Sequence, residues 1–363
     1  MKVYIYSEAM DKIGKSGVGR AIFHQMTAAA LNGIEVVDCM EKADVVHINT
    51  VLPRSFGLAR ECKKKDVPLV YHAHSTREDF RNSYIGANAV AGLFKQWLIK
   101  CYSMGDVIVT PSEYSKRLLQ GYGIKNEILA ISNGIDIGEY RRDEQAGREF
   151  RRKFGFAEDD KIVMSAGLLI KRKGVHDFAE IARRLPQYKF IWFGTADLRF
   201  VGKEVRSAVK NTPENLTFAG YVEKPVLQTA LSGSDLFLFP SYEETEGIVV
   251  LEALAMRIPV LLRNIPVYDG WICSQGGGIG TIPTSRTAST ISCGSRRIFS
   301  KTAFRHWSGT VMRSRARAAS NELVHSSPRR TDARSSFAAR DGVNVSVKHI
   351  SPYKSDVSKK LII

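Results

Sequence analysis

The chain has 363 residues, of which 44% are hydrophobic and 25% are charged, so it is long enough and apolar enough for two α/β domains. Its start, MKVYIYSEAM, holds an apolar run too short for a signal peptide, and no run reaches the roughly 18 apolar residues of a membrane span. The cysteines are scattered without CxxC spacing, which argues against a disulfide framework or a zinc site. These features predict a cytoplasmic globular protein.

The net charge of +16 is distributed unevenly along the chain. Residues 272–363 hold 16 Lys and Arg against 4 Asp and Glu, so this segment carries +12 and residues 1–271 carry +4. The basic segment has few interleaved aromatic residues and no repeating pattern. Nucleic-acid binding would therefore rest on net charge alone, and we expect no nucleic-acid partner.

Residues 1–140 alternate short apolar runs with stretches of helical periodicity. The expected buried strands are KVYIYSE, IEVVD, DVVHIN, PLVYHAH, DVIVTPS and ILAISNG. Amphipathic stretches between several of them are long enough for crossover helices, which predicts a parallel, doubly wound sheet. The charged segment that follows predicts an exposed linker at 141–157.

Glycines follow the first expected strand in KIGKSGVGRAIFHQ. Gly14, Gly17 and Gly19 precede or open a helix, where glycine lets backbone N–H groups come close to a ligand. Lys15 and Arg20 add positive charge. A purely steric role at a strand-to-helix turn is the alternative interpretation.

Two histidines, His72 and His74, end the expected strand PLVYHAH. A histidine at the carboxyl end of a parallel strand can form a hydrogen bond with a ligand hydroxyl, and a structural role is equally open. No third ligand stands at metal spacing, so the sequence predicts no metal site.

The segment VAGLFKQWLIKCYSM has apolar residues at i, i+3, i+4, i+7, i+8 and i+11, namely Val90, Leu93, Phe94, Trp97, Leu98 and Cys101. This stripe predicts a helix that faces the core. The alternative is an interfacial helix on acidic lipid, with Trp97 at the depth of the headgroups.

A second alternation occupies residues 158–271. The expected strands are KIVMSAG, YKFIWFG, NLTFAG, DLFLFPS and PVLLRN. Two Rossmann-like domains in tandem are the simplest interpretation. Ligands should then lie at the carboxyl ends of the strands, in the cleft between two facing parallel sheets.

A pair of cations, Arg172 and Lys173, falls just after the strand KIVMSAG and ahead of a helix that begins near Gly174. Cations at that point can neutralise a diphosphate leaving group. A solvated basic turn is the alternative.

The segment DLFLFPSYEETEGIVVLEALA carries the most specific pattern in the chain. Gly247 opens an apolar helix, with Glu244 before its start and Glu252 inside it. The free N–H groups at the start of a helix can bind a phosphate group. A carboxylate on either side of it can accept hydrogen bonds, one from a ribose and the other from a second sugar. This arrangement predicts a nucleotide-sugar site, against the alternative of an acidic surface loop.

Taken together, these segments resemble the retaining GT-B glycosyltransferases of family 4, and most closely the bacterial enzymes that glycosylate diacylglycerol or glucosyl-diacylglycerol. The resemblance covers residues 1 to about 271. It is carried by KSGVGRAIFHQ, YHAHSTREDFRNSYIGAN, TPSEYSKRLL, ISNGID, SAGLLIKRKG and FPSYEETEGIVVLEALA, with STREDFRNSYIGAN indicating a lipid acceptor.

The resemblance implies transfer of a hexose from UDP-glucose or UDP-galactose to diacylglycerol or glycosyl-diacylglycerol, with retention of configuration. Residues 1–140 would form the acceptor-side domain and 158–271 the donor domain. The protein would act peripherally on the anionic inner face of the cell membrane. No cofactor and no metal are implied, because cationic side chains and the helix dipole take the place of a metal ion.

The resemblance also assigns roles to residues. Glu252 would hold the ribose, Glu244 would bind donor-sugar hydroxyls, and His74 would line the donor sugar. The family usually has an arginine about five residues before the phosphate-binding lysine; here that position is Leu168, which leaves Arg172 as the substitute. We therefore predict catalytic roles for His74, Lys173 and Glu244, and donor contacts from Gly17, Gly19, Arg172, Gly247, Ile248 and Glu252.

At Trp271 the character of the chain changes, because residues 272–363 become rich in Ser and Arg and lose periodicity. A disordered basic tail, an insertion and a frameshift are the open interpretations. The family continues past PVYDGW with a strand and long helices, and only DGVNV at 341–345 resembles that continuation. We expect an incomplete second domain. A catalytically dead or unstable product of a disrupted reading frame is the alternative function.

Overall fold

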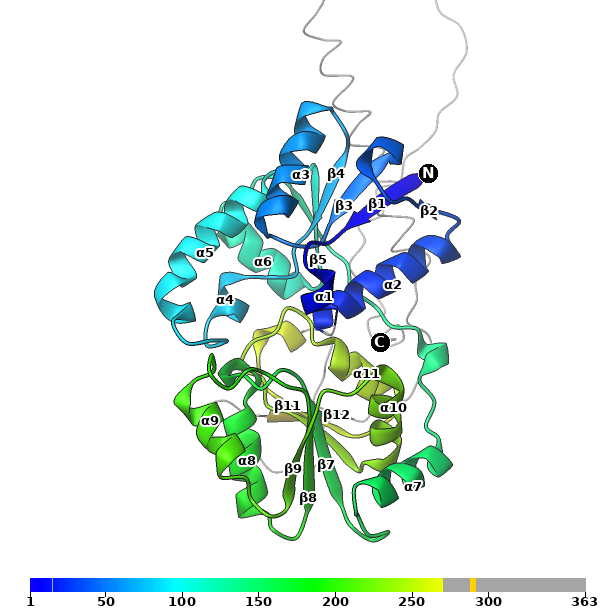
Figure 1. Cartoon of the computed structure of the whole chain (residues 1–363), viewed down its shortest axis with the longest axis vertical. Helices are drawn as coiled ribbons and strands as arrows, with labels where there is room; N and C mark the ends of the chain where they lie inside the picture. The colour runs from blue at the N-terminus through cyan, green and yellow to red at the C-terminus, as the bar shows by residue number, and fades with distance from the viewer. Residues whose placement is uncertain (15, 270–287, 292–363) are drawn as a thin grey trace, which may run out of the picture.

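The computed structural model describes residues 1–14, 16–269 and 288–291. It contains two α/β domains, one above the other in Figure 1, each with a sheet between layers of helices. The first sheet has the strand order β2-β1-β3-β4-β5-β6, and every pairing in it is parallel. Its strands are β1 Lys2–Tyr6, β2 Glu35–Val36, β3 Val45–Ile48, β4 Leu69–His72, β5 Val107–Thr110 and β6 Glu127–Ala130.

The helices of the first domain connect these strands as crossovers. They are α1 Met10–Ile13, α2 Gly17–Leu31, η1 Met40–Lys42, α3 Pro53–Lys64, α4 Arg77–Phe80, α5 Ala87–Tyr102 and α6 Glu113–Gly121. The strands β3, β4 and β5 are buried along their whole length. Strands covered by helices on both faces have continuous apolar runs, which is why VVHI and VIVT do not alternate.

The second sheet has the order β12-β11-β10-β7-β8-β9. Its strands are β7 Ile162–Ala166, β8 Lys189–Phe193, β9 Leu216–Gly220, β10 Leu236–Phe239, β11 Val260–Arg263 and β12 Ala288–Ile291. The helices are η2 Ile137–Glu139, α7 Glu144–Lys153, η3 Lys171–Lys173, α8 Val175–Arg184, α9 Lys203–Lys210, α10 Lys224–Gly233, α11 Ile248–Ala255 and η4 Pro266–Tyr268. The prediction of two doubly wound parallel sheets is confirmed.

Strand β12 is a correction, because the sequence pattern predicts no strand after Trp271. This strand runs antiparallel to β11, with Ala288 opposite Arg263 and Ile291 opposite Val260. Without it β11 would be an edge strand with unpaired N–H and C=O groups, and the short segment ASTI satisfies them. The DGVNV match at 341–345 lies outside the described residues.

Helix α7 corrects the prediction of an exposed linker. It packs on α10 of the second domain, where Phe150 is 2% exposed and Arg151 donates to the Gly233 carbonyl at 2.9 Å. The Arg151 guanidinium also pairs with Asp235 at 2.9 Å. The charges of EQAGREFRRK hide this packing in the sequence, since one large apolar side chain is enough to fix a short helix on its neighbour.

Helix α5 faces the core along its whole length, with Ala87 and Ala91 buried in its first half and Leu98, Cys101 and Tyr102 in its second. Trp97 lies partly buried, with its indole N–H donating to the Val51 carbonyl at 2.6 Å, which agrees with the core-facing interpretation for this residue. Leu93, near the start of the helix, is 74% exposed. Within the described ranges, no helix has the length and apolar character to cross a membrane.

Candidate active site

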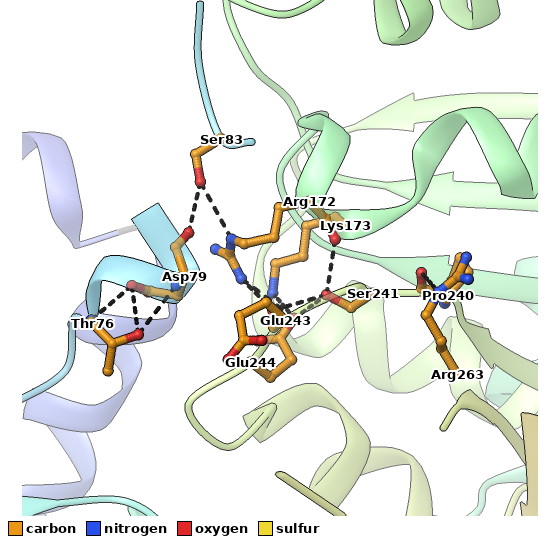
Figure 2. Close-up of polar contacts among 10 residues, drawn as sticks. All are labelled: Thr76, Asp79, Ser83, Arg172, Lys173, Pro240, Ser241, Glu243, Glu244 and Arg263. Atoms are coloured by element: carbon orange, nitrogen blue, oxygen red, sulfur yellow. Dashed lines mark hydrogen bonds and ion pairs between the residues drawn. The ribbon is translucent and has the colours of Figure 1, made fainter. Parts of the chain in front are cut away.

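The carboxyl ends of the two sheets face each other, and several hydrogen bonds join the domains there (Figure 1). The Arg172 N–H donates to the Asn82 carbonyl at 3.0 Å, and the Ser112 hydroxyl donates to the Thr245 carbonyl at 2.6 Å. Figure 2 shows part of the boundary between the domains, where Arg172, Lys173, Glu243 and Glu244 of the second domain face Thr76, Asp79 and Ser83 of the first.

The loop that carries the acids runs from the end of β10 to the start of α11. Gly247 caps α11 with φ of 90°, a left-handed conformation that favours glycine. The residues at the start of the helix, Ile248 and Val249, follow in partly exposed positions. Glu244 and Glu252 are both buried on either side of this turn. The predicted strand, loop and helix are therefore present as expected.

Glu244 is held by the predicted pair of cations. One of its carboxylate oxygens accepts from the Lys173 ammonium and from the Ser241 hydroxyl at 2.6 Å, and the Arg172 guanidinium lies 3.7 Å away (Figure 2). Burial opposes ionisation of this carboxyl, but the charges of Lys173 and Arg172 outweigh it and lower the pKa of Glu244. The site thus holds an ionised carboxylate against a buried ammonium at the carboxyl end of the sheet.

Arg172 is committed to contacts that join the domains. Its Nε donates across the domain boundary to the Ser83 hydroxyl at 3.3 Å, and its Nη1 donates within the second domain to the Glu243 carbonyl at 2.7 Å (Figure 2). The predicted contact between Arg172 and the sugar-nucleotide donor would therefore compete with these two hydrogen bonds. Lys173 is the cation that points at Glu244 most directly.

Glu252 is fully buried on the other side of the loop. Its Oε1 accepts from the Arg20 guanidinium of the first domain and from the Tyr140 hydroxyl at 2.8 Å. Its Oε2 is buried and has no hydrogen-bond partner among the described residues. A buried carboxylate oxygen without a donor is costly, which makes this atom a candidate acceptor for a ligand hydroxyl.

The glycine loop divides into two kinds of position. A Cβ on Gly19 would lie 2.4 Å from the Gly14 carbonyl oxygen, so Gly19 is needed for close packing, and it is buried. Gly17 is exposed, with nothing within 4 Å of an added Cβ. The steric interpretation therefore holds for Gly19, whereas the exposed Gly17 has room for a side chain. Lys15 lies outside the described residues.

His74 lies just beyond β4, buried beneath the cleft. Its Nε2 lies 2.9 Å from Asn49 Oδ1, and its ring stacks on that of His72 with centroids 4.1 Å apart. Burial lowers the pKa of His74 to about 3, so the imidazole is neutral at physiological pH. In the described part of the chain, no group of three or more His, Cys, Asp or Glu is arranged to hold a metal ion.

Comparison with known proteins identifies the family. Residues 17–139 match the family described as Glycosyltransferase Family 4, and residues 147–301 match Glycosyl transferases group 1. The processive diacylglycerol alpha-glucosyltransferase of Acholeplasma laidlawii is 42% identical over 274 residues, which cover 75% of this chain and 81% of that protein. The chain belongs to the family 4 glycosyltransferases.

Further relatives of this glycosyltransferase agree with that placement. The alpha-galactosylglucosyldiacylglycerol synthase of Streptococcus pneumoniae is 28% identical, over 72% of this chain and 71% of that protein. The structure of Anabaena HepE in complex with UDP and glucose matches with a TM-score of 0.58 at 17% identity, over 72% of this chain and 80% of that one. This likeness confirms the GT-B fold. The match to the second family model runs to residue 301, past the change in the character of the chain at Trp271.

Sequence patterns do not indicate two of the residues that build this glycosyltransferase site. Tyr140 stands at the edge of the expected linker, and its contact with Glu252 has no local signal. From its sequence context Glu246 is expected to be an exposed glutamate in a loop, but it is buried. Its carboxylate accepts hydrogen bonds from the Asn133 side-chain amide at 2.6 Å and from the Asn133 backbone N–H at 3.2 Å. Since Asn133 follows β6, Glu246 joins the two domains beside the active site.

Glu246 makes stability depend on pH. Burial raises the pKa of Glu246 from 4.5 to about 7, so between these values the folded state holds a proton that the unfolded state has lost. The stabilisation is complete below pH 4.5 and is lost as the pH rises through 7, by about 3 kcal/mol for the whole shift. Glu246→Gln should remove this slope and raise the melting temperature at pH 8.

The measurement is chemical unfolding of the full chain from pH 5 to pH 8. Glu144→Gln, at an exposed position of α7, is the control and should keep the slope of the unaltered protein. A Glu246→Gln slope equal to that of the unaltered protein would contradict a carboxyl that is protonated in the folded state.

Proposed function

We propose that this glycosyltransferase transfers glucose from UDP-glucose to a membrane glycerolipid, diacylglycerol or its glycosylated form, with retention of configuration. The observation that carries the proposal is the placement of Lys173, Glu244 and Glu252 around the start of α11, with one oxygen of Glu252 lacking a partner among the described residues. The printed names of two relatives, a diacylglycerol glucosyltransferase and a galactosylglucosyldiacylglycerol synthase, support the acceptor class. UDP-galactose is the second donor to test.

The site suits a nucleotide-sugar for physical reasons. Glu252 Oε2 would accept from the ribose, and the free N–H groups of Gly247 and Ile248 would meet the diphosphate. Lys173 would stabilise the charge that develops on the diphosphate as its bond to the anomeric carbon breaks. The acceptor oxygen forms the new bond to that carbon, and its proton leaves with the UDP product or to solvent. Glu244 would hold the sugar hydroxyls while this happens.

The acceptor side of the cleft exposes a group of apolar side chains, which we call the apolar rim: Tyr84, Ile85, Val90, Leu93 and Phe200. The rim spans both domains, since the Ile85 N–H donates to the Phe200 carbonyl at 2.9 Å. Arg81 lies exposed beside it, and Arg199, which pairs with Asp197, lies over the ring of Phe200. Apolar side chains flanked by cations suit an anionic bilayer surface, and we propose that the enzyme docks there peripherally, on the inner face of the cell membrane.

The apolar rim can be tested with Ile85→Glu/Leu93→Glu. We expect co-sedimentation with anionic phospholipid vesicles to fall at least about tenfold. The variant loses two apolar side chains that would enter the bilayer, and the two glutamates that replace them are repelled by the anionic lipid. Leu31→Glu, at an exposed position of α2 away from the rim, is the matched control and should bind as the unaltered protein does. Equal vesicle binding by the rim variant would exclude this face as the docking surface.

The function itself is tested with the full chain, radiolabelled UDP-glucose or UDP-galactose, and vesicles that contain diacylglycerol. We expect UDP release and a lipid product whose new linkage has the anomeric configuration of the donor. Folded protein that neither binds UDP nor uses either donor would overturn the proposal. UDP binding without product would instead identify a catalytically dead chain.

A further inference from the structure

A buried network of amide and imidazole side chains lies behind His74, at the carboxyl ends of β3 and β4. Asn49, which follows β3, is 3% exposed, and its Oδ1 lies 2.9 Å from His74 Nε2. Gln25 of α2 donates from Nε2 to the same Asn49 oxygen at 2.8 Å, and its Nε2 also lies 3.0 Å from His72 Nδ1. Three elements of the first domain therefore converge on one amide oxygen.

The orientation of the Asn49 amide decides which nitrogen of His74 carries the proton: Oδ1 faces the ring, and the buried Nδ2 has no hydrogen-bond partner among the described residues. An amide oxygen can only accept, and the Gln25 amide already donates to it. The His74 Nε2 at 2.9 Å must then carry its own proton, which leaves Nδ1 as the nitrogen with a lone pair. Among the described residues, no hydrogen bond reaches that Nδ1.

No carboxylate competes for this proton. The titratable groups that act on His74 are the stacked imidazoles His72 and His47, and burial lowers the pKa of all three rings. Neither neighbouring ring can hold His74 in a charged form. The side chain that decides which nitrogen of the neutral ring bears the proton is Asn49.

We propose that Asn49 is a positioning residue for the transfer reaction. It holds His74 as the neutral Nε2–H tautomer, so that Nδ1 accepts a hydrogen bond from a hydroxyl of the donor sugar. This inference rests on the proposed function, because it takes the sugar to lie against His74. It goes beyond that function by naming the group that sets the polarity of the histidine.

Three variants test the proposal: Asn49→Asp, Asn49→Leu, and Asn49→Asp combined with His74→Ala. Aspartate keeps the acceptor but adds a charge that favours the protonated imidazole, in which Nδ1 becomes a donor. We expect kcat/KM for UDP-glucose to fall about tenfold from pH 8 to pH 5.5 in Asn49→Asp, with no such limb in the unaltered protein. The double variant should not show this fall in kcat/KM at low pH, because it lacks the imidazole that becomes protonated.

Asn49→Leu should lower kcat/KM at every pH without creating a new ionisation, and its melting temperature and UDP affinity report whether it folds. A second measurement needs no turnover: long-range ¹H–¹⁵N spectra of histidine-labelled protein give the tautomer of the resonance that His74→Ala removes. Nε2–H supports the proposal. Nδ1–H overturns it, as does an Asn49→Asp pH profile that coincides with that of an active unaltered protein. An unaltered protein that shows the Nε2–H tautomer but does not use UDP-glucose refutes the proposed function instead.

Discussion

Replacing Glu252 by glutamine is expected to weaken UDP binding by about tenfold to a hundredfold, the effect of losing one hydrogen bond to a charged group. The carboxylate is fully buried, and Arg20 and Tyr140 both occupy its Oε1. They leave Oε2 as the atom that would accept from the ribose hydroxyl in the proposed function. An amide has the same shape but no charge, so both the contact with Arg20 and the contact with the ribose hydroxyl lose their charge assistance.

Titration calorimetry with UDP measures this directly, because no acceptor lipid is needed. Glu204→Gln is a matched control: it removes a glutamate that pairs with Lys171 at 2.9 Å outside the loop, and it should bind UDP as the unaltered protein does. Melting curves separate lost affinity from lost structure. UDP affinity in Glu252→Gln equal to that of the control would mean that Glu252 is not a ribose ligand.

Much of the fold can be predicted from local sequence, for a physical reason. Strands such as VVHI in β3 and VIVT in β5 are covered on both faces, so they have continuous apolar runs bounded by polar residues. The same logic locates the ends of the strands, and in a parallel sheet these ends share one edge. The positions of Lys173, Glu244 and Glu252 in the chain are therefore enough to predict that they lie in one cleft.

The contacts between the domains cannot be predicted in this way. Arg20 and Glu252 lie 232 positions apart, and their pairing depends on how the two sheets are placed relative to each other. Glu246 with Asn133, and Tyr140 with Glu252, have the same origin. Periodicity reports which face of an element is covered, but it does not report which side chain covers it.

Short elements escape prediction for a different reason. In α7, Phe150 is the one large aliphatic or aromatic side chain, and in β12 a segment of four residues pairs with the edge of β11. Neither segment is long enough to show a period. Each is held by its neighbour, α10 or β11, so its structure is tertiary in origin.

Replacing Lys173 by methionine is expected to lower kcat by about 10²- to 10³-fold, the usual cost of removing one group that stabilises charge in a transition state. Lys173 is buried against Glu244, and methionine preserves most of the volume of the side chain. The loss should fall on kcat more than on KM, since the charge on the diphosphate grows as the bond to the sugar breaks. Lys171→Met, which alters a half-exposed neighbour paired with Glu204, is the control and should turn over normally.

The same substitution should also destabilise the fold, and a second change separates the two effects. Without Lys173, the Glu244 carboxylate keeps the Ser241 hydroxyl at 2.6 Å and Arg172 at 3.7 Å, so a buried charge is left poorly compensated. Lys173→Met/Glu244→Gln removes that charge and should recover most of the lost melting temperature while the rate stays low. If the double variant regained turnover together with stability, Lys173 would serve the fold alone, and the charge on the leaving group would have to be met elsewhere.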